Sequence, residues 1–217
     1  NSSSPPDKVW EDLPKSMQQQ ILEVAAEAFA QDGFKGASLN RVIDEAGISK
    51  GAFYYYFDDK ADLFLTVIEY AWKAVMPVDL VKVEELEAEN YWSMLSLLME
   101  ESRVRARDNP WLIGVTRLMY DPPDLPGLQE TLGELFGTVR QWQADLIRRG
   151  QALGVVRSDL PVSLLQALVV GADDAVDRWF AQSWDTLDDA EVERLFTVVF
   201  GTFRCILAPP DRASAGP

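Results

Sequence analysis

Apolar residues recur every three or four positions from residue 15 to residue 207, which is the spacing of one face of an α-helix. No stretch shows the sustained alternation of apolar and polar residues that a half-buried strand requires. Proline and glycine interrupt the pattern where one helix would end and the next begin. The pattern predicts an all-α protein with about nine helices, at 15–31, 39–46, 50–57, 60–75, 89–107, 111–119, 128–153, 161–183 and 188–207.

The segment from residue 38 to residue 60 reads SLNRVIDEAGISKGAFYYYFDDK and contains two short helical patterns joined at Gly47. Glycine tolerates the backbone conformation of a sharp turn between them. In the second helix Phe53 and Phe57 share one side, with Tyr56 half-turned toward it. The other side carries Lys50, Gly51, Tyr54 and Tyr55.

This second face suits the major groove of DNA. Lysine can reach a guanine edge or a phosphate, and glycine lets the backbone approach closely. Tyrosine hydroxyls can donate hydrogen bonds to phosphate oxygens. The segment therefore predicts a helix-turn-helix motif whose second helix reads DNA.

Ser38, Ser49 and Lys60 each stand at the predicted N-terminus of a helix, where unpaired backbone N–H groups attract phosphate. A simpler interpretation is that the serines only cap their helices and that Lys60 is a solvated surface residue. Asp58 and Asp59 are predicted to cap the helix that begins at Lys60, with their carboxylates turned away from DNA.

Composition narrows the possible functions. The chain has 217 residues, 20 Lys and Arg against 35 Asp and Glu, and a formal net charge of −15. This charge argues against a protein that coats nucleic acid by sheer positive charge, although it does not exclude DNA reading by well-placed groups. The chain has no histidine, which removes the commonest general base and most zinc ligand sets. We therefore expect no enzyme activity, no cofactor and no metal.

Two further features concern location and redox state. The apolar run at 167–172 is far shorter than the roughly 20 residues that span a bilayer, and no signal segment opens the sequence. We expect a cytoplasmic protein that does not enter a membrane. The single cysteine, Cys205, cannot form an internal disulfide and lies among apolar residues, which predicts a buried position.

The first predicted helix followed by SLNRVIDEAGISKGAFYYYFDDKADLF resembles the DNA-binding domain of the TetR family of one-component transcriptional regulators. The most specific part is the turn GISKG at 47–51, followed by FYYYF and Lys60. The resemblance implies that operator DNA is contacted by Ser38, Ser49, Lys50, Gly51, Tyr54, Tyr55 and Lys60, with Arg41 as a further reader of bases or phosphates. It also implies a helix-turn-helix domain at 15–59, a connecting helix at 60–76, and a ligand-binding and dimerisation domain at 77–208. The small, polar and proline-rich residues near the two ends predict a flexible leader at 1–14 and a tail at 209–217.

The last two predicted helices are apolar around most of their circumference, so each needs burial on two sides. The resemblance implies that these helices form a homodimer interface, and symmetric reading of two half-sites also requires a dimer. The alternative is a monomer core that covers both helices by itself. The predicted interface residues are Leu164, Leu168, Val176, Val192, Phe196, Val199 and Phe203.

The signals for a ligand pocket are weaker, because large apolar side chains are more often core residues. Candidate pocket residues are Trp72, Trp92, Trp111, Met119 and Trp142. Asp173 and Asp177 share one stripe of an otherwise apolar helix and would select a cationic ligand if they faced the pocket. Asp174 is predicted to pair with Arg178 four residues on. The expected effector is an unknown apolar or aromatic small molecule, with a cationic group if the two carboxylates bind it.

Three functional hypotheses follow. The first is a homodimeric, ligand-responsive transcriptional repressor that a small molecule releases from double-stranded operator DNA. The second is an acidic helical interaction protein without DNA binding, and the third is a helical-bundle enzyme that uses the carboxylates of Asp173, Asp174 and Asp177. The complete outward face of the second short helix favours the first hypothesis over the second, and the absence of histidine disfavours the third.

Overall fold

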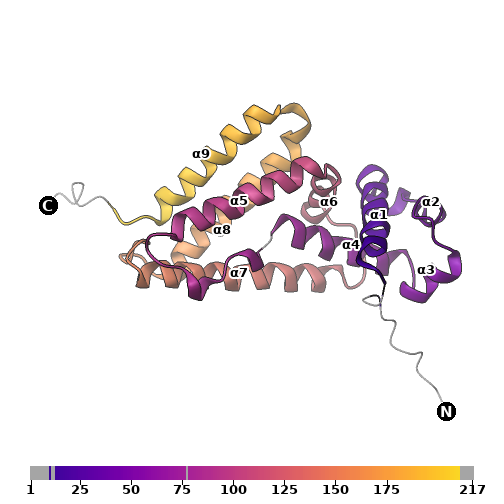
Figure 1. The fold of residues 1–217 in the computed structure, drawn as a ribbon, viewed down its shortest axis with the longest axis horizontal. Helices are drawn as coiled ribbons and strands as arrows, with labels where there is room; N and C mark the ends of the chain where they lie inside the picture. Colours follow the sequence, from indigo (N-terminus) through magenta and orange to yellow (C-terminus); the bar gives the residue numbers. More distant parts are fainter. Residues whose placement is uncertain (1–9, 11–12, 77, 211–217) are drawn as a thin grey trace, which may run out of the picture. The chain divides into compact units, whose positions relative to one another are not determined.

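The computed structural model describes residue 10 and residues 13–76 and 78–210. Over these ranges the chain is all-α, with nine α-helices and no strand (Figure 1). The helices are α1 (Lys15–Gly36), α2 (Leu39–Glu45), α3 (Lys50–Tyr56), α4 (Lys60–Val75), α5 (Tyr91–Asp108), α6 (Trp111–Tyr120), α7 (Leu128–Ala152), α8 (Val162–Ser183) and α9 (Asp189–Leu207). The predicted fold class is therefore confirmed, and each helix lies close to its predicted range. None of the described helices is both long and apolar enough to cross a membrane.

Three short 3-10 helices within residues 78–210 were not predicted. They are η2 (Val78–Leu80), η3 (Val83–Glu85) and η4 (Trp184–Thr186). Part of the predicted leader and of the predicted tail, together with Pro77, lies outside the described residues.

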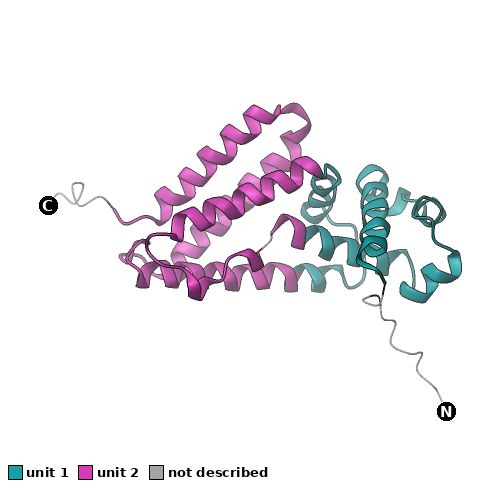
Figure 2. Ribbon diagram, viewed as in Figure 1, with its two compact units in different colours: residues 1–72, 109–132 teal, residues 73–108, 133–217 magenta. Residues whose placement is uncertain are grey.

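The chain divides into two compact units (Figure 2). Unit 1 comprises residues 1–72 and 109–132, and unit 2 comprises residues 73–108 and 133–217. Unit 1 therefore contains α6 and the first turn of α7 in addition to α1, α2, α3 and most of α4. The sequence-based division, which placed α6 with the C-terminal helices, differs from this grouping, and its functional domain boundaries stay a prediction.

The core of unit 1 contains a pair of packed phenylalanine rings. Phe29 of α1 and Phe64 of α4 are fully buried, with their ring centroids 4.9 Å apart in an edge-to-face arrangement. The regular part of α1 ends at Gly33, whose φ of 68° is a conformation that favours glycine. Met17, in the first turn of α1, is 42% exposed.

Helix α6 packs against α1 at very short range. A Cβ atom added to Gly114 would lie 2.4 Å from the Cβ of Ala30. Next to this contact, the rings of Tyr70 and Trp111 stack with centroids 5.8 Å apart and planes within 10°. Burial, with a smaller contribution from the Glu23 carboxylate, raises the pKa of the Tyr70 phenol. The close approach makes α6 an integral part of unit 1.

In unit 2, α9 packs against both α5 and α8, and a buried hydrogen bond joins α5 to α7. The fully buried Tyr91 donates a hydrogen bond from its hydroxyl to the carbonyl of Leu146, at 3.0 Å. Burial raises the pKa of this phenol above its ordinary value. Gly150 allows the approach, because an added Cβ would lie 2.7 Å from the Tyr91 hydroxyl oxygen.

The C-terminal helices correct one expectation. Helix α9 begins with a capping box formed by Asp188 and Glu191. Thr186, in the segment before it, donates its hydroxyl proton to the carbonyl of Ser183 at the end of α8. Cys205 is exposed on α9 and not buried, because it lies on the opposite side of the helix from the covered residues.

Candidate nucleic-acid interface

Helix α3 has two distinct faces, as predicted. Phe53 is fully buried and Phe57, at the C-terminal cap, is 2% exposed. On the opposite face Tyr54 is 54% and Tyr55 is 52% exposed. Lys50 and Gly51 are exposed in the same turn region, and Tyr56 is half-buried. The inward rings fix the helix, and the outward face is available to a partner.

The turn before α3 sets the angle between the two helices of the motif. Gly47 follows α2 with a φ of 66°, which side chains disfavour. The Oγ of Ser49 then accepts the N–H of Ala52 at 3.0 Å and caps α3. Ser38 caps α2 by accepting the N–H of Arg41 at 3.4 Å. Both serines are therefore caps, and each keeps a hydroxyl proton that can still be donated to a phosphate.

The two aspartates that follow α3 serve the start of α4. The Oδ1 of Asp59 accepts the N–H groups of Ala61 and Asp62, at 2.7 and 3.0 Å. The backbone N–H of Asp58 donates to the Oδ2 of Asp62 at 3.0 Å. The predicted capping role of Asp59 is confirmed.

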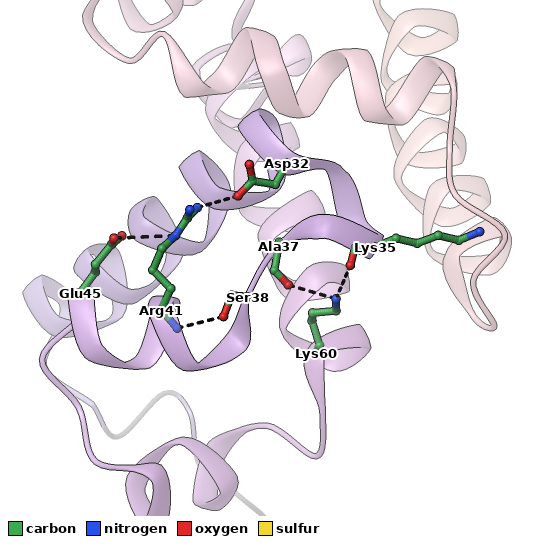
Figure 3. Close-up of polar contacts among 7 residues, drawn as sticks. All are labelled: Asp32, Lys35, Ala37, Ser38, Arg41, Glu45 and Lys60. Atoms are coloured by element: carbon green, nitrogen blue, oxygen red, sulfur yellow. Dashed lines mark hydrogen bonds and ion pairs between the residues drawn. The ribbon is translucent and has the colours of Figure 1, made fainter.

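Lys60 joins the start of α4 to the end of α1 (Figure 3). Its Nζ donates to the carbonyls of Ala37 at 3.1 Å and of Lys35 at 3.4 Å. The same ammonium group lies 4.8 Å from the ring centroid of Phe34. Cations favour the C-terminal end of a helix, where carbonyls lack intrahelical partners. Lys60 therefore has a structural role, and the predicted contact with DNA stays a prediction.

Arg41 is also engaged within unit 1. Its Nη2 donates to the Oδ2 of Asp32 at 2.8 Å, and its Nε lies 3.7 Å from the Oε1 of Glu45 (Figure 3). The first contact joins α2 to α1, and the second lies within α2. Asp32, Arg41 and Glu45 form a cluster that we call the Arg41 clamp. A phosphate would have to compete with two carboxylates for this guanidinium, so the predicted DNA contact of Arg41 also stays a prediction.

The predicted pocket residues are distributed over both units. Trp111 and Met119 are buried in unit 1, where Trp72 is half-buried. In unit 2 Trp92 packs edge-on against Phe200, and the guanidinium of Arg204 lies 5.4 Å from its ring. Of the predicted pocket residues, Trp142 is the one that lines the groove described next.

A groove of about 1270 Å³ runs in unit 2 between the segment 78–84 and α7. The Nε1 of Trp142 donates to the carbonyl of Val81 at 3.3 Å, and the Nε of Arg149 donates to the carbonyl of Leu86 at 2.9 Å. These two α7 side chains attach the irregular segment to the helix. The groove is lined by Val78, Asp79, Val81, Lys82, Val83, Glu84, Glu134, Gly137, Thr138, Gln141, Trp142, Asp145 and Arg149.

The two aspartates predicted to bind a cation do not line this groove. The carboxyl of Asp173 is largely buried, and burial together with the neighbouring Asp174 carboxylate raises its pKa to about 6. Asp177 is half-buried on the same helix. The predicted pair between Asp174 and Arg178 is confirmed, at 3.4 Å.

Helices α8 and α9 expose an apolar face in unit 2. Leu164 is 44% and Leu168 is 46% exposed, and a shallow apolar groove of about 380 Å³ contains Val176 and Val199. Phe196 and Phe203 are half-buried, and Phe196 packs on Phe180. Val192 is 6% exposed, so its side chain is already covered within one chain. The sequence prediction omitted Trp179 and Val198, which are 47% and 55% exposed.

Helix α3 has the form of a DNA recognition helix. It is short and capped, it presents a lysine, a glycine and two exposed tyrosines, and a glycine turn sets its angle to α2. The fold and this surface define a helix-turn-helix DNA-binding protein. Residues 21–67 match the family described as bacterial regulatory proteins, tetR family. The N-terminal part of the chain therefore carries the DNA-binding domain of this family, and the protein is a DNA-binding transcriptional regulator.

Similar proteins agree with this assignment. Over 175 residues the chain is 26% identical to the HTH-type transcriptional repressor AcnR of Corynebacterium diphtheriae, a match that covers 77% of this chain and 83% of AcnR. Among solved structures, the transcriptional regulator FadR from Bacillus subtilis, in complex with stearoyl-CoA, superposes with a TM-score of 0.69 at 18% identity, covering 85% of this chain and 96% of FadR. SmeT, the repressor of a Stenotrophomonas maltophilia multidrug efflux pump, gives a TM-score of 0.71 at 16% identity, covering 89% and 91%. The two structural matches show a common fold.

Proposed function

We propose that this chain represses transcription as a homodimer and that a small molecule releases it from operator DNA. The observation that carries the proposal is the outward face of α3, where Lys50, Gly51, Tyr54 and Tyr55 are all exposed. The similarity to AcnR, which is named a repressor, supports the direction of regulation. Action on DNA would place the protein in the cytoplasm.

Dimerisation follows from how such motifs read DNA. Two recognition helices reach successive major grooves when they are about 34 to 36 Å apart, which requires two copies related by symmetry. The exposed apolar face of α8 and α9 supports an interface there, because an isolated chain would leave Leu164, Leu168 and Trp179 in water. A four-helix contact between two copies would bury this face.

For the effector, we propose the groove between residues 78–84 and α7. Trp142 supplies an aromatic surface, and Val78, Val81 and Val83 supply apolar ones. Four carboxylates line the groove against two cations, Lys82 and Arg149. Lys82 is also paired with Glu85 at 3.1 Å, outside the lining. This balance favours an apolar or aromatic effector with a positive group over an anionic one.

Release of DNA needs only modest coupling between the two sites. Helix α4 begins in unit 1 and ends in unit 2, so it is covalently part of both. A 100-fold loss of operator affinity corresponds to about 2.7 kcal/mol, which lies within the ordinary allosteric range. Displacement of α4 by a bound effector would supply this coupling by changing the spacing of the two recognition helices.

Selection from a pool of random DNA duplexes tests the DNA-binding part of this proposal. The wild-type protein should enrich a near-palindromic duplex, with an affinity that falls steeply as salt is added. Replacing both Lys50 and Tyr54 by alanine should weaken binding to that duplex at least 100-fold, as measured by fluorescence anisotropy at a fixed salt concentration. Lys73→Ala, which removes an exposed lysine from α4, serves as the control and should bind as wild type does. Wild-type affinity in the double variant would refute the assignment of α3 as the reading helix.

A further inference from the structure

An aromatic residue from the predicted leader lies on the recognition helix. The ring of Trp10 is 4.9 Å from that of Phe57 and 5.8 Å from that of Tyr56, measured between centroids. The contact with Tyr56 is edge-to-face, and the Trp10 side chain is half-buried. Trp10 therefore covers the C-terminal end of α3, on the side away from the exposed tyrosines.

The backbone around Trp10 is held by α1. The side-chain amide of Gln18 donates from Nε2 to the carbonyls of Trp10 and Leu13, at 3.0 and 2.9 Å. The N–H of Leu13 also donates to the carbonyl of Trp10, at 3.2 Å. Gln18 lies in the first turn of α1, so the position of Trp10 is fixed by one helix and its ring rests on another.

Ring contacts continue from Trp10 to both exposed tyrosines. Through Tyr56 they reach Tyr55, since the centroids of these two rings are 4.9 Å apart. Through Phe57 they reach Phe53 at 5.3 Å, and Phe53 meets the ring of Tyr54 at 5.1 Å. The side chains that face outward for DNA are thus supported from behind by a layer of rings that ends at Trp10.

This support matters because α3 has seven residues. A helix of this length is marginal on its own, so packing against the rest of the unit determines its position. Phe53 and Phe57 attach its inner side, and Trp10 packs on Tyr56 at the point where the helix ends. Loss of that contact would let the last turn of α3 tilt or fray, and Tyr54 and Tyr55 would move with it.

We propose that Trp10 is a positioning residue for DNA recognition, which orients the recognition helix without touching DNA itself. The inference rests on the proposed DNA-reading function of α3. It assigns a role in that function to a residue outside the helix-turn-helix segment and outside the residues that match the family.

Binding measurements with the duplex that the wild-type protein selects from a random pool test this role. Trp10→Ala should raise the dissociation constant for this duplex about tenfold, equivalent to about 1.4 kcal/mol. Its affinity for an unrelated duplex and the slope of affinity against salt should stay unchanged, because both depend on positively charged side chains, and the substitution removes none. Trp10→Phe keeps an aromatic ring and should recover most of the loss. Met17→Ala removes an exposed apolar side chain from the same end of α1 and should bind as wild type does.

Hydrogen exchange without DNA supplies a second measurement. The N–H groups of Phe53 and Phe57, which bond to Ser49 and Phe53 at 2.9 Å, should exchange faster in Trp10→Ala, while the amides of α2 serve as the internal reference. Unchanged operator affinity in Trp10→Ala would overturn the positioning role, whether or not exchange accelerates. If the wild-type protein selected no duplex at all, the proposed DNA-reading function would fail, and the positioning role with it.

Discussion

The buried carboxyl of Asp173 should make the stability of this protein depend on pH in a direction opposite to that of most carboxylates. Burial raises the pKa of Asp173 from 3.8 to about 6, and the negative charge of Asp174 adds to the effect. The folded state therefore holds the proton more tightly than the unfolded state does. The contribution of Asp173 to stability is greatest below about pH 4, falls as the pH rises through the interval up to about 6, and stays lower above it.

The size of this change in stability follows from the shift in the pKa of Asp173. A difference of about two pKa units corresponds to about 3 kcal/mol at neutral pH, as an upper figure for a carboxyl that retains some access to water. Asp173→Asn keeps the shape of the side chain but cannot ionise. It should therefore be more stable than wild type by about 2 to 3 kcal/mol at pH 7.5, and the two proteins should converge near pH 4.

Urea unfolding at several pH values, at one fixed protein concentration, measures this difference. Asp174→Asn is the matched control, because its carboxylate is exposed and pairs with Arg178 on the same helix. Its effect should stay below about 1 kcal/mol, and most of the pH dependence should persist. A stability difference between wild type and Asp173→Asn that is the same at pH 4 and pH 7.5 would refute the reasoning.

Two other predictions concern unit 1. In the Arg41 clamp, Asp32→Asn removes one of the two carboxylates that compete with phosphate for Arg41. Affinity for the selected duplex should therefore rise about threefold to tenfold, and the slope of affinity against salt should steepen by about one. An unchanged slope in anisotropy titrations would mean that Arg41 does not reach a phosphate. Gly114→Val should destabilise the protein by about 1 to 3 kcal/mol in thermal unfolding, because its side chain would overlap α1. Gly133→Ala is the control, because its Cβ would meet no atom within 4 Å, and it should be neutral or slightly stabilising. Equal losses of stability in both variants would contradict the packing argument.

Local features of the structure were predictable from sequence. Helix limits depend on prolines, glycines and caps that lie within a few residues of each boundary, and the two faces of α3 follow from its periodicity. Contacts between distant segments were not predictable. The packing of Gly114 on Ala30 places α6 in unit 1, and no pattern within residues 111–119 signals that partner. The same holds for Trp10 on Phe57 and for the carbonyls that engage Lys60.

The candidate sites show the same division between local and distant information. Exposure of Tyr54 and Tyr55 was predicted, because one helix of known phase determines it. The pairing of Arg41 with Asp32 depends on how α1 and α2 cross, so sequence could name Arg41 as a reader but could not reveal its competing partner. The groove along α7 likewise depends on an irregular segment, 78–84, for which periodicity gives no prediction.

The chain path through unit 1 has a consequence for how the protein is synthesised. The chain leaves unit 1 within α4, forms α5 in unit 2, and returns to add α6 and the first turn of α7. During translation, the surface of α1 that receives Gly114 stays uncovered until α6 has been synthesised. The helix-turn-helix is therefore synthesised before the helix that completes its unit, and a fragment that ends with α4 would lack part of the core of unit 1.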